Sequence, residues 1–255
     1  MKKDNILILK NDRAGDLFTS LTLISTLLSK YNNISIYMSQ LNIDFSFFFK
    51  NSKINRVNYN LTLFEKTKIF IDILINKYDR VYILTPKKFY FYLPFIFRKI
   101  KFYAITYDNN KNLRPSKYLR SFLYKHRTIY RNKINLKSYR DLQSELLEND
   151  IIIDKNLKYL NIPKISKEFK SLLPDEFIVF QFRYLFFHKL GWGIDEFKYL
   201  LSQLKTKYKF ILFSSDIENN RRTNYYNKYF SENYSILNTI NLTVSINKKI
   251  LTFSF

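Results

Sequence analysis

The strongest constraint on the fold is the pattern of residues at the start of the chain. Residues 6–9 (Ile-Leu-Ile-Leu) form a short apolar run that is typical of a strand buried on both faces. A polar segment, residues 10–16, follows. Apolar residues then recur at the spacing of an amphipathic helix: Leu17, Leu21, Ile24 and Leu28. A second apolar run covers residues 34–38. This order of strand, loop, helix and strand predicts a Rossmann-type unit.

The alternation of strands and helices continues along the chain. The patterns predict a helix at 64–76, a strand at 82–84, a short helix at 89–97, a strand at 102–105 and a helix end at 142–147. A second strand–helix–strand unit is predicted at 177–182, 194–204 and 210–213. We therefore expect an α/β fold with two Rossmann-like domains.

The domain boundaries are expected in the middle of the chain. Residues 150–175 show no clear period and contain Pro163 and Pro174. We assign residues 1–155 to the first domain, 156–175 to a linker and 176–255 to the second domain. About 80 residues follow the linker, whereas a doubly wound domain usually needs roughly 100–150. The second domain is therefore expected to be incomplete.

The charge balance favours anionic partners. Lys and Arg number 43 against 21 Asp and Glu, a net charge of +22. Nucleic acid, an anionic membrane surface or a phosphorylated substrate would each suit this excess. A coding bias that enriches Lys, Asn, Ile, Phe and Tyr is the alternative explanation.

Some classes of site and of location are disfavoured by what the sequence lacks. The chain has no Cys, which excludes disulfides, thiolate metal sites and a cysteine nucleophile. Its two histidines, His126 and His188, are too few for a histidine-rich metal site, so we expect no metal. No apolar run reaches the roughly 18 residues that span a bilayer, and the N-terminal run is too short for a signal peptide. We expect a cytoplasmic protein.

Four segments in order resemble the lipopolysaccharide heptosyltransferase family. They are ILILKNDRAGDLFTSLTLISTLLSKYNNISIYM, KYDRVYIL, FIVFQFRYLFFHKLGWGIDEFKYLLSQL and ILFSSDIE. The resemblance covers residues 1–218. It implies the GT-B arrangement, in which two Rossmann-like domains face a cleft. It also implies transfer of heptose from ADP-heptose to a lipopolysaccharide-core acceptor, with inversion at the anomeric carbon and no metal or other cofactor.

The resemblance places the catalytic base at Asp16. This aspartate closes the Gly-Asp turn between the first strand and its helix, and a carboxylate there could take the proton of the acceptor hydroxyl. Gly15 would permit a tight turn. The alternative is that Asp16 is a helix N-cap, a role that Asp fills in proteins of any function.

Three further residues are implied to bind the nucleotide sugar. Lys189 matches the basic residue that neutralises the diphosphate, although the spacing Lys-Leu-Gly-Trp is one residue longer than in the family. Arg183 is a weaker match for the same role. Glu218 matches the acidic residue that binds the ribose, with Asp216 an equally plausible neighbour. Each of them could instead be an ordinary solvated side chain.

The acceptor side is expected to be basic. Arg13, Arg98, Arg114 and Arg120 are the candidates, because guanidinium groups bind the carboxylates and phosphates of an anionic glycolipid. Residues 87–99 (KKFYFYLPFIFRK) are aromatic and flanked by charge, which favours contact with the cytoplasmic face of the inner membrane. A buried helix with charged ends is the alternative.

One expected motif is missing, and its absence keeps two other functions open. The family has an Asp-Gly pair before a helix that begins His-x-x-Ala, yet no Gly follows Gly193 and no His follows His188. The chain could therefore be a degenerate, inactive relative with a shortened C-terminus. It could also be a basic nucleic-acid-binding protein, although no nucleic-acid-binding module is recognisable and no specific nucleic acid is expected.

Overall fold

The structure is a computed structural model. It describes residues 2–108, 115–130, 137–148 and 150–162, together with residues 177–182, 199, 203 and 209–214 in the C-terminal part of the chain. The chain divides into two compact units, Met1–Ile162 and Pro163–Phe255. Among the described helices, none is long and apolar enough to cross a membrane.

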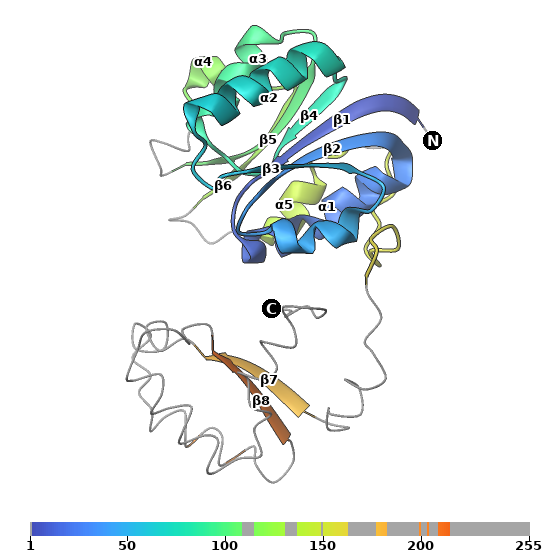
Figure 1. Cartoon of the computed structure of the whole chain (residues 1–255), viewed down its shortest axis with the longest axis vertical. Coiled ribbons are helices and arrows are strands. Elements are labelled where there is room, and N and C mark those ends of the chain that lie inside the picture. The colour runs from blue at the N-terminus through green and yellow to red at the C-terminus, as the bar shows by residue number, and fades with distance from the viewer. Residues whose placement is uncertain are drawn as a thin grey trace. The chain divides into compact units, whose positions relative to one another are not determined.

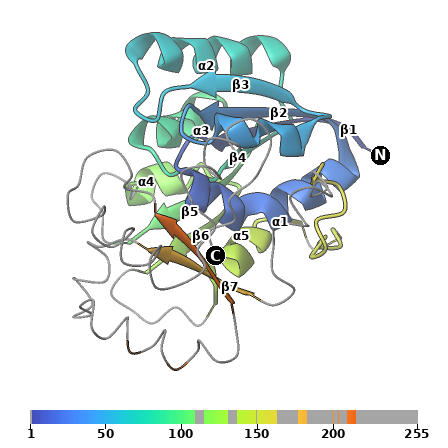
Figure 2. The same cartoon turned by 60° about the horizontal axis from the view of Figure 1, so that its bottom comes forward.

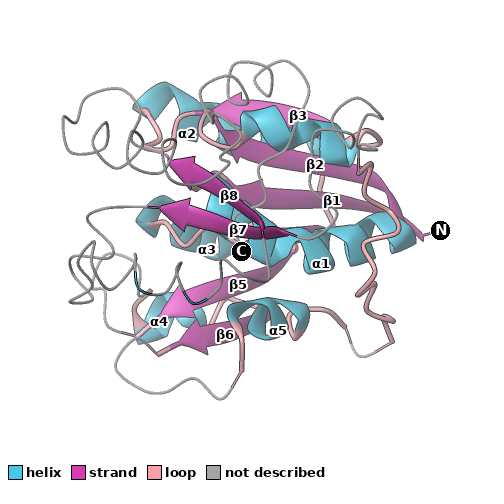
Figure 3. Ribbon diagram, turned by 90° about the horizontal axis from the view of Figure 1, so that it is seen from below, coloured by secondary structure: helices cyan, strands magenta, loops and turns pink. Residues whose placement is uncertain are grey.

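The first unit is built on a six-stranded parallel sheet with the order β3-β2-β1-β4-β5-β6. The strands are β1 (Lys2–Lys10), β2 (Tyr31–Ser39), β3 (Lys53–Val57), β4 (Arg80–Ile83), β5 (Lys101–Tyr107) and β6 (Lys125–Ile129). The labelled strands of this sheet point the same way in Figure 3, and β4 pairs in parallel with β1 and β5, so the carboxyl ends share one edge, which we call the carboxyl edge. The chain reverses its direction of travel across the sheet between β1 and β4. Open α/β sheets bind ligands at the carboxyl edge beside such a crossover.

Helices cover both faces of this sheet. They are α1 (Ala14–Lys30), α2 (Leu63–Asn76), α3 (Leu93–Ile96), α4 (Lys117–Arg120) and α5 (Tyr139–Ser144), with 3₁₀ helices at Ile43–Phe49 and Lys88–Tyr92. Helices α1 and α5 lie on one face, and α2, α3 and α4 lie on the other (Figure 1). Figure 2 shows the same arrangement from a second direction, with α2 and α1 on opposite sides of the sheet. The layers confirm the predicted α/β class.

The apolar runs of the sequence form the core. Residues 6–9 of β1 are fully buried, because helices cover the central strand on both sides. Helix α1 buries ten of its side chains against the sheet and its neighbours. Helix α2 begins with a capping box, in which Thr62 and Glu65 each accept a hydrogen bond from the other's backbone N–H.

Several elements differ from the sequence predictions. Helix α1 begins at Ala14 rather than Leu17, so Gly15 lies inside the helix and not in a tight turn. An added Cβ at Gly15 would meet nothing within 4 Å. The strands β3 and β6 were not predicted. Both are edge strands, and their sequences, KINRV and KHRTI, are too polar to form an apolar run.

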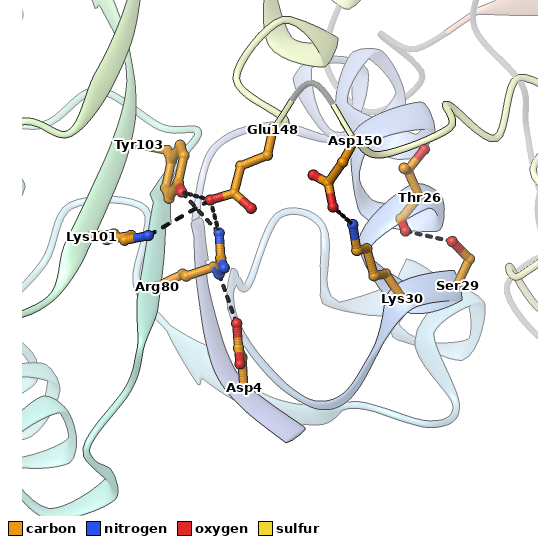
Figure 4. Close-up of polar contacts among 9 residues, drawn as sticks. All are labelled: Asp4, Thr26, Ser29, Lys30, Arg80, Lys101, Tyr103, Glu148 and Asp150. Atoms are coloured by element: carbon orange, nitrogen blue, oxygen red, sulfur yellow. Dashed lines mark hydrogen bonds and ion pairs between the residues drawn. The ribbon is translucent and has the colours of Figure 1, made fainter. Parts of the chain in front are cut away.

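A cluster of charged residues ties the amino-terminal ends of the central strands to the chain after α5 (Figure 4). The Arg80 side chain is only 9% exposed. Its Nε donates to Asp4 Oδ2 at 3.0 Å, and its Nη1 donates to Tyr103 Oη at 3.0 Å and to Glu148. Tyr103 also donates to Glu148 Oε1, at 2.9 Å. Lys30 and Asp150 form a separate, more exposed pair at 2.7 Å.

The end of the first unit returns across α1. Ser25 Oγ donates to Asp154 Oδ2 at 2.5 Å, and the Asp154 N–H donates to Thr26 Oγ1 at 2.8 Å. Farther on, the Asn161 N–H donates to the Phe48 carbonyl at 2.9 Å. Residues up to Ile162 are therefore hydrogen-bonded to the first unit.

In the second unit two parallel strands are described, β7 (Phe177–Phe182) and β8 (Lys209–Ser214). They pair from Phe177 with Lys209 to Phe182 with Ser214. Both strands were predicted at these places. The helix predicted between them, at 194–204, lies outside the described residues apart from Tyr199 and Gln203.

Candidate functional site

The loop after β1 lies at the carboxyl edge beside the crossover between β1 and β4. The loop is residues 11–13, between the last residue of β1, Lys10, and the first residue of α1, Ala14. Long-range hydrogen bonds hold the loop in place: Ser39 Oγ donates to the Asp12 carbonyl at 2.5 Å, and Asn42 Nδ2 donates to the Lys10 carbonyl at 3.1 Å. The loop is thus a fixed part of the sheet edge.

Lys10 and Asp12 form a buried ion pair where β1 passes into this loop. Lys10 Nζ lies 2.7 Å from Asp12 Oδ2, and the Lys10 side chain is fully buried. Burial raises the pKa of Asp12, the neighbouring Lys10 opposes that rise, and the charge of Asp16 adds to it.

Asp16 is exposed in the first turn of α1. Its backbone carbonyl accepts hydrogen bonds from Thr19 Oγ1 at 2.7 Å and Ser20 Oγ at 3.3 Å. Among the described residues, none donates a hydrogen bond to its carboxylate. The N-cap of the helix is Arg13, so Asp16 is not the N-cap that the alternative interpretation expected. Because no described residue binds the Asp16 carboxylate, this group is available to a ligand.

Arg13 lies next to Asp16 at the same sheet edge. It is exposed, and its side chain makes no capping hydrogen bond to α1. The N-terminus of a helix attracts anions through its unpaired N–H groups and its dipole. A guanidinium at this position adds to that attraction. Of the three candidate acceptor arginines that the structure describes, Arg13 is the one placed beside Asp16.

The loops after β3 and β4 also lie at the carboxyl edge, and hydrogen bonds join them to the loop after β1. Tyr90 Oη donates to Asn11 Oδ1 at 2.9 Å, and Asn11 Nδ2 donates to the Asn58 carbonyl at 3.2 Å. Lys87 Nζ donates to the Tyr59 carbonyl and lies 4.5 Å from the centre of the Tyr59 ring. Burial lowers the pKa of Lys87, against the attraction of Asp12 and Glu65. Lys87 therefore adds a partly desolvated cation to the same edge.

Sequence reasoning missed Lys10, Asp12 and Lys87 as parts of the site. The sequence pattern predicts only a polar loop around Lys10 and Asp12 and an aromatic segment flanked by Lys87. Their positions directly after the predicted strands 6–9 and 82–84 could have identified them, because the carboxyl ends of parallel strands meet at one edge.

The other two described arginines lie elsewhere. Arg98 precedes β5 and is therefore at the opposite edge of the sheet from Asp16. Its guanidinium lies 5.3 Å from the Phe95 ring centre and 5.2 Å from that of Phe122. Arg120 ends α4, and its Nε donates to the Pro115 carbonyl at 3.3 Å. The structure does not bring these two residues together with Asp16. Arg114 lies outside the described residues.

The candidate donor residues, Arg183, Lys189 and Glu218, also lie outside the described residues, as do Asp216 and His188. In the sequence, Arg183 directly follows the last residue of β7, and Glu218 comes four positions after the end of β8. His126 is in β6, where burial and then the charges of Arg120 and Arg127 lower its pKa. Within the described part of the chain, no group of three or more His, Asp or Glu side chains could hold a metal ion.

Comparisons with known proteins show which folds the chain resembles. No protein-family model and no curated protein sequence matches it. A glycosyl transferase of family 9 from Veillonella parvula shares the fold with a TM-score of 0.56 and 16% sequence identity. The match covers 86% of this chain and 65% of that protein, so the chain spans slightly less than two thirds of its length. Escherichia coli heptosyltransferase WaaC, solved with ADP, matches with a TM-score of 0.51 and 12% identity over 91% of this chain and 74% of that one.

At such low sequence identity, the comparison shows that the folds are alike and nothing more. It agrees with the family resemblance in the sequence, because both solved structures are glycosyltransferases and one is a heptosyltransferase. The chain shares the α/β fold of these glycosyltransferase structures.

Proposed function

We propose that the protein is a glycosyltransferase that moves a sugar from a nucleotide sugar to a glycan acceptor, with Asp16 as the general base. The observation that carries this proposal is the exposed carboxylate of Asp16 at the carboxyl edge, beside the β1–β4 crossover. The likeness to glycosyltransferase structures supports it.

The proposed reaction is a single displacement. Asp16 takes the proton of an acceptor hydroxyl, and the oxygen attacks the anomeric carbon of the donor sugar. The new C–O bond forms as the bond to the nucleoside diphosphate breaks, which inverts the anomeric centre. With no metal, cationic side chains must stabilise the departing diphosphate. Lys189 and Arg183 are the proposed cations, and Glu218 is proposed to bind the ribose.

Heptose from ADP-heptose is the proposed donor sugar, and a lipopolysaccharide-core glycolipid is the proposed acceptor. The acceptor would be anionic, which suits Arg13 beside Asp16 and the net charge of +22. Arg114 remains a candidate for its outer groups. Arg98 and Arg120 are left out, because they precede β5 and β6 at the other edge of the sheet. The enzyme would work at the cytoplasmic face of the inner membrane.

The test is a transfer assay with ADP-heptose and a deacylated core acceptor, comparing the unaltered protein with Asp16→Asn. Loss of a general base should lower kcat on the order of a hundredfold or more. Because Asp16 is exposed and its carboxylate has no partner in the described part of the chain, the melting temperature should stay the same. Equal activity in the two proteins would refute the role of Asp16.

A thermal shift with ADP separates the proposed enzyme from a degenerate relative. A ligand that binds only the native state raises the melting temperature. A saturable rise with ADP, absent with UDP and GDP, is expected of an ADP-sugar transferase. No shift with any nucleotide would favour the inactive relative.

A further inference from the structure

The outer face of α2 is apolar and yet exposed. In this helix, Ile69 and Ile73 are the buried residues. The residues with large exposed fractions are Leu63 and Phe64 (79% each), Ile71 (46%), Leu74 (60%) and Ile75 (67%). Phe64, Ile71 and Ile75 follow one another at i, i+7 and i+11, so they share one stripe of the helix. An apolar stripe of this size on a surface helix marks an interaction site.

The apolar surface continues onto α3. Phe95 and Ile96 of α3 are 38% and 52% exposed, and Tyr92, which directly precedes α3, is 42% exposed. The two helices lie on the same face of the sheet (Figure 1), and the rings of Phe70 and Phe97 join them with centres 5.0 Å apart. We call the exposed apolar residues of α2 and α3 the α2–α3 face.

Positive charge surrounds the α2–α3 face. Residues 88–101 contain four basic residues and no acidic one. Helix α2 contributes Lys66 and Lys68, and Lys77 follows it. The two acids of α2 are engaged within the protein: Glu65 accepts from Thr62 and Asn58, and Asp72 accepts from Tyr78 and Asn76. The surface thus combines apolar side chains with cations.

A hollow of about 500 Å³ lies where α2 ends, and its lining has the same character. Apolar side chains, among them Leu74, Phe97 and Ile100, line it together with Lys77, Lys99 and Lys101. Its acids are again paired, since Asp4 binds Arg80 and Asp79 accepts from the Asn5 N–H. An apolar wall with a basic rim suits an amphiphile with an anionic head.

We propose that the α2–α3 face docks on the surface of an anionic lipid bilayer. The apolar side chains would enter the boundary between headgroups and acyl chains, and the lysines would contact anionic headgroups. A second copy of this chain is a poorer occupant, because it would bring lysines against lysines in a protein of net charge +22. The proposal deepens the proposed function, since it rests on an acceptor that is a membrane glycolipid.

Vesicle co-sedimentation of the full chain tests the proposal, with no nucleotide sugar present. Vesicles of phosphatidylcholine alone are compared with vesicles that also contain phosphatidylglycerol. Binding is expected to the anionic vesicles and to weaken with salt. The double variant Phe64→Asp, Ile75→Asp should bind at least on the order of tenfold more weakly, because it removes apolar contacts and adds negative charge.

The matched control is Ile152→Asp, Ile162→Asp. Ile152 and Ile162 are 91% and 46% exposed and lie outside the α2–α3 face, so this variant adds the same two negative charges and should bind vesicles like the unaltered protein. If both variants lose vesicle binding equally, net charge alone explains the loss and the proposal is overturned. A dimer in solution that Phe64→Asp, Ile75→Asp dissociates would also overturn it, because a second copy would then cover the face.

Transfer to the deacylated acceptor separates this proposal from the proposed enzyme. The double variant should retain that transfer, because Phe64 and Ile75 are remote in sequence from Asp16 and belong to a helix on the other face of the sheet from α1. In the unaltered protein, transfer without vesicle binding would overturn the docking surface alone. Vesicle binding without transfer would overturn the enzyme alone.

Discussion

Glu148→Gln tests whether the Arg80 cluster stabilises the first unit (Figure 4). Glu148 accepts hydrogen bonds from Arg80 and Tyr103, and its side chain is 21% exposed. Removing one partner of a buried ion pair costs about 3–5 kcal/mol. Arg80 keeps Asp4, and the glutamine carbonyl can still accept a hydrogen bond. We therefore expect the free energy of unfolding to fall by about 2 kcal/mol.

Urea unfolding of the full chain, followed by far-UV circular dichroism, measures this loss. The control is Asp150→Asn in the neighbouring pair with Lys30, where the Asp150 side chain is 60% exposed. An exposed pair contributes about 0–1 kcal/mol. If both substitutions lower the free energy of unfolding by the same amount, the reasoning from burial is refuted.

The contribution of Glu148 to the free energy of unfolding should depend on pH. Burial alone would raise the pKa of Glu148, but hydrogen bonds from Arg80 and Tyr103 outweigh it and lower the pKa below its ordinary value of 4.5. The carboxylate therefore stabilises the fold above pH 4.5, and this contribution is lost as the pH falls through the folded-state pKa. The difference between the unaltered protein and Glu148→Gln should shrink on acidification. A constant difference down to pH 3 would contradict the assignment.

Two further predictions concern the loop after β1. Lys10→Met leaves the buried Asp12 without its cation, so urea unfolding should show a loss of about 3–5 kcal/mol. Adding Asp12→Leu should restore part of it, and failure to do so would show that packing matters more than charge. Gly15→Ala should raise the free energy of unfolding by up to about 1 kcal/mol, because Gly15 is inside α1 with open space beside it. A stable Gly15→Ala protein with impaired transfer would indicate that the acceptor needs this space.

The central elements could be predicted because their sequences are dictated by burial. Residues 6–9 are apolar since β1 is covered on both faces, and α1 shows a clear helical period because one side faces the sheet. The edge strands β3 and β6 have no such requirement. Lys53 and Lys125 begin strands whose polar side chains reach solvent, so the sequence of neither strand contains an apolar run.

The candidate site was only partly predictable. Asp16 was found through the order of family-like segments. The pairing of Lys10 with Asp12 depends on burial by residues distant in the sequence, such as Ser39 and Asn42, and loop residues give no sign of such burial. Arg98 was grouped with the basic stretch by its place in the sequence. Its place before β5 puts it at the other edge of the sheet.

The return of residues 150–162 across α1 has a consequence for protein engineering. Asp154 forms hydrogen bonds with α1, and Asn161 donates one to the 3₁₀ helix at 43–49. Both residues are therefore part of the first unit. A chimera that joins this unit to a second domain from a solved glycosyltransferase structure should keep the chain through Ile162. A junction at residue 155 would instead sever the hydrogen bonds of Tyr159 and Asn161 and leave Ser25 and Phe48 without these partners.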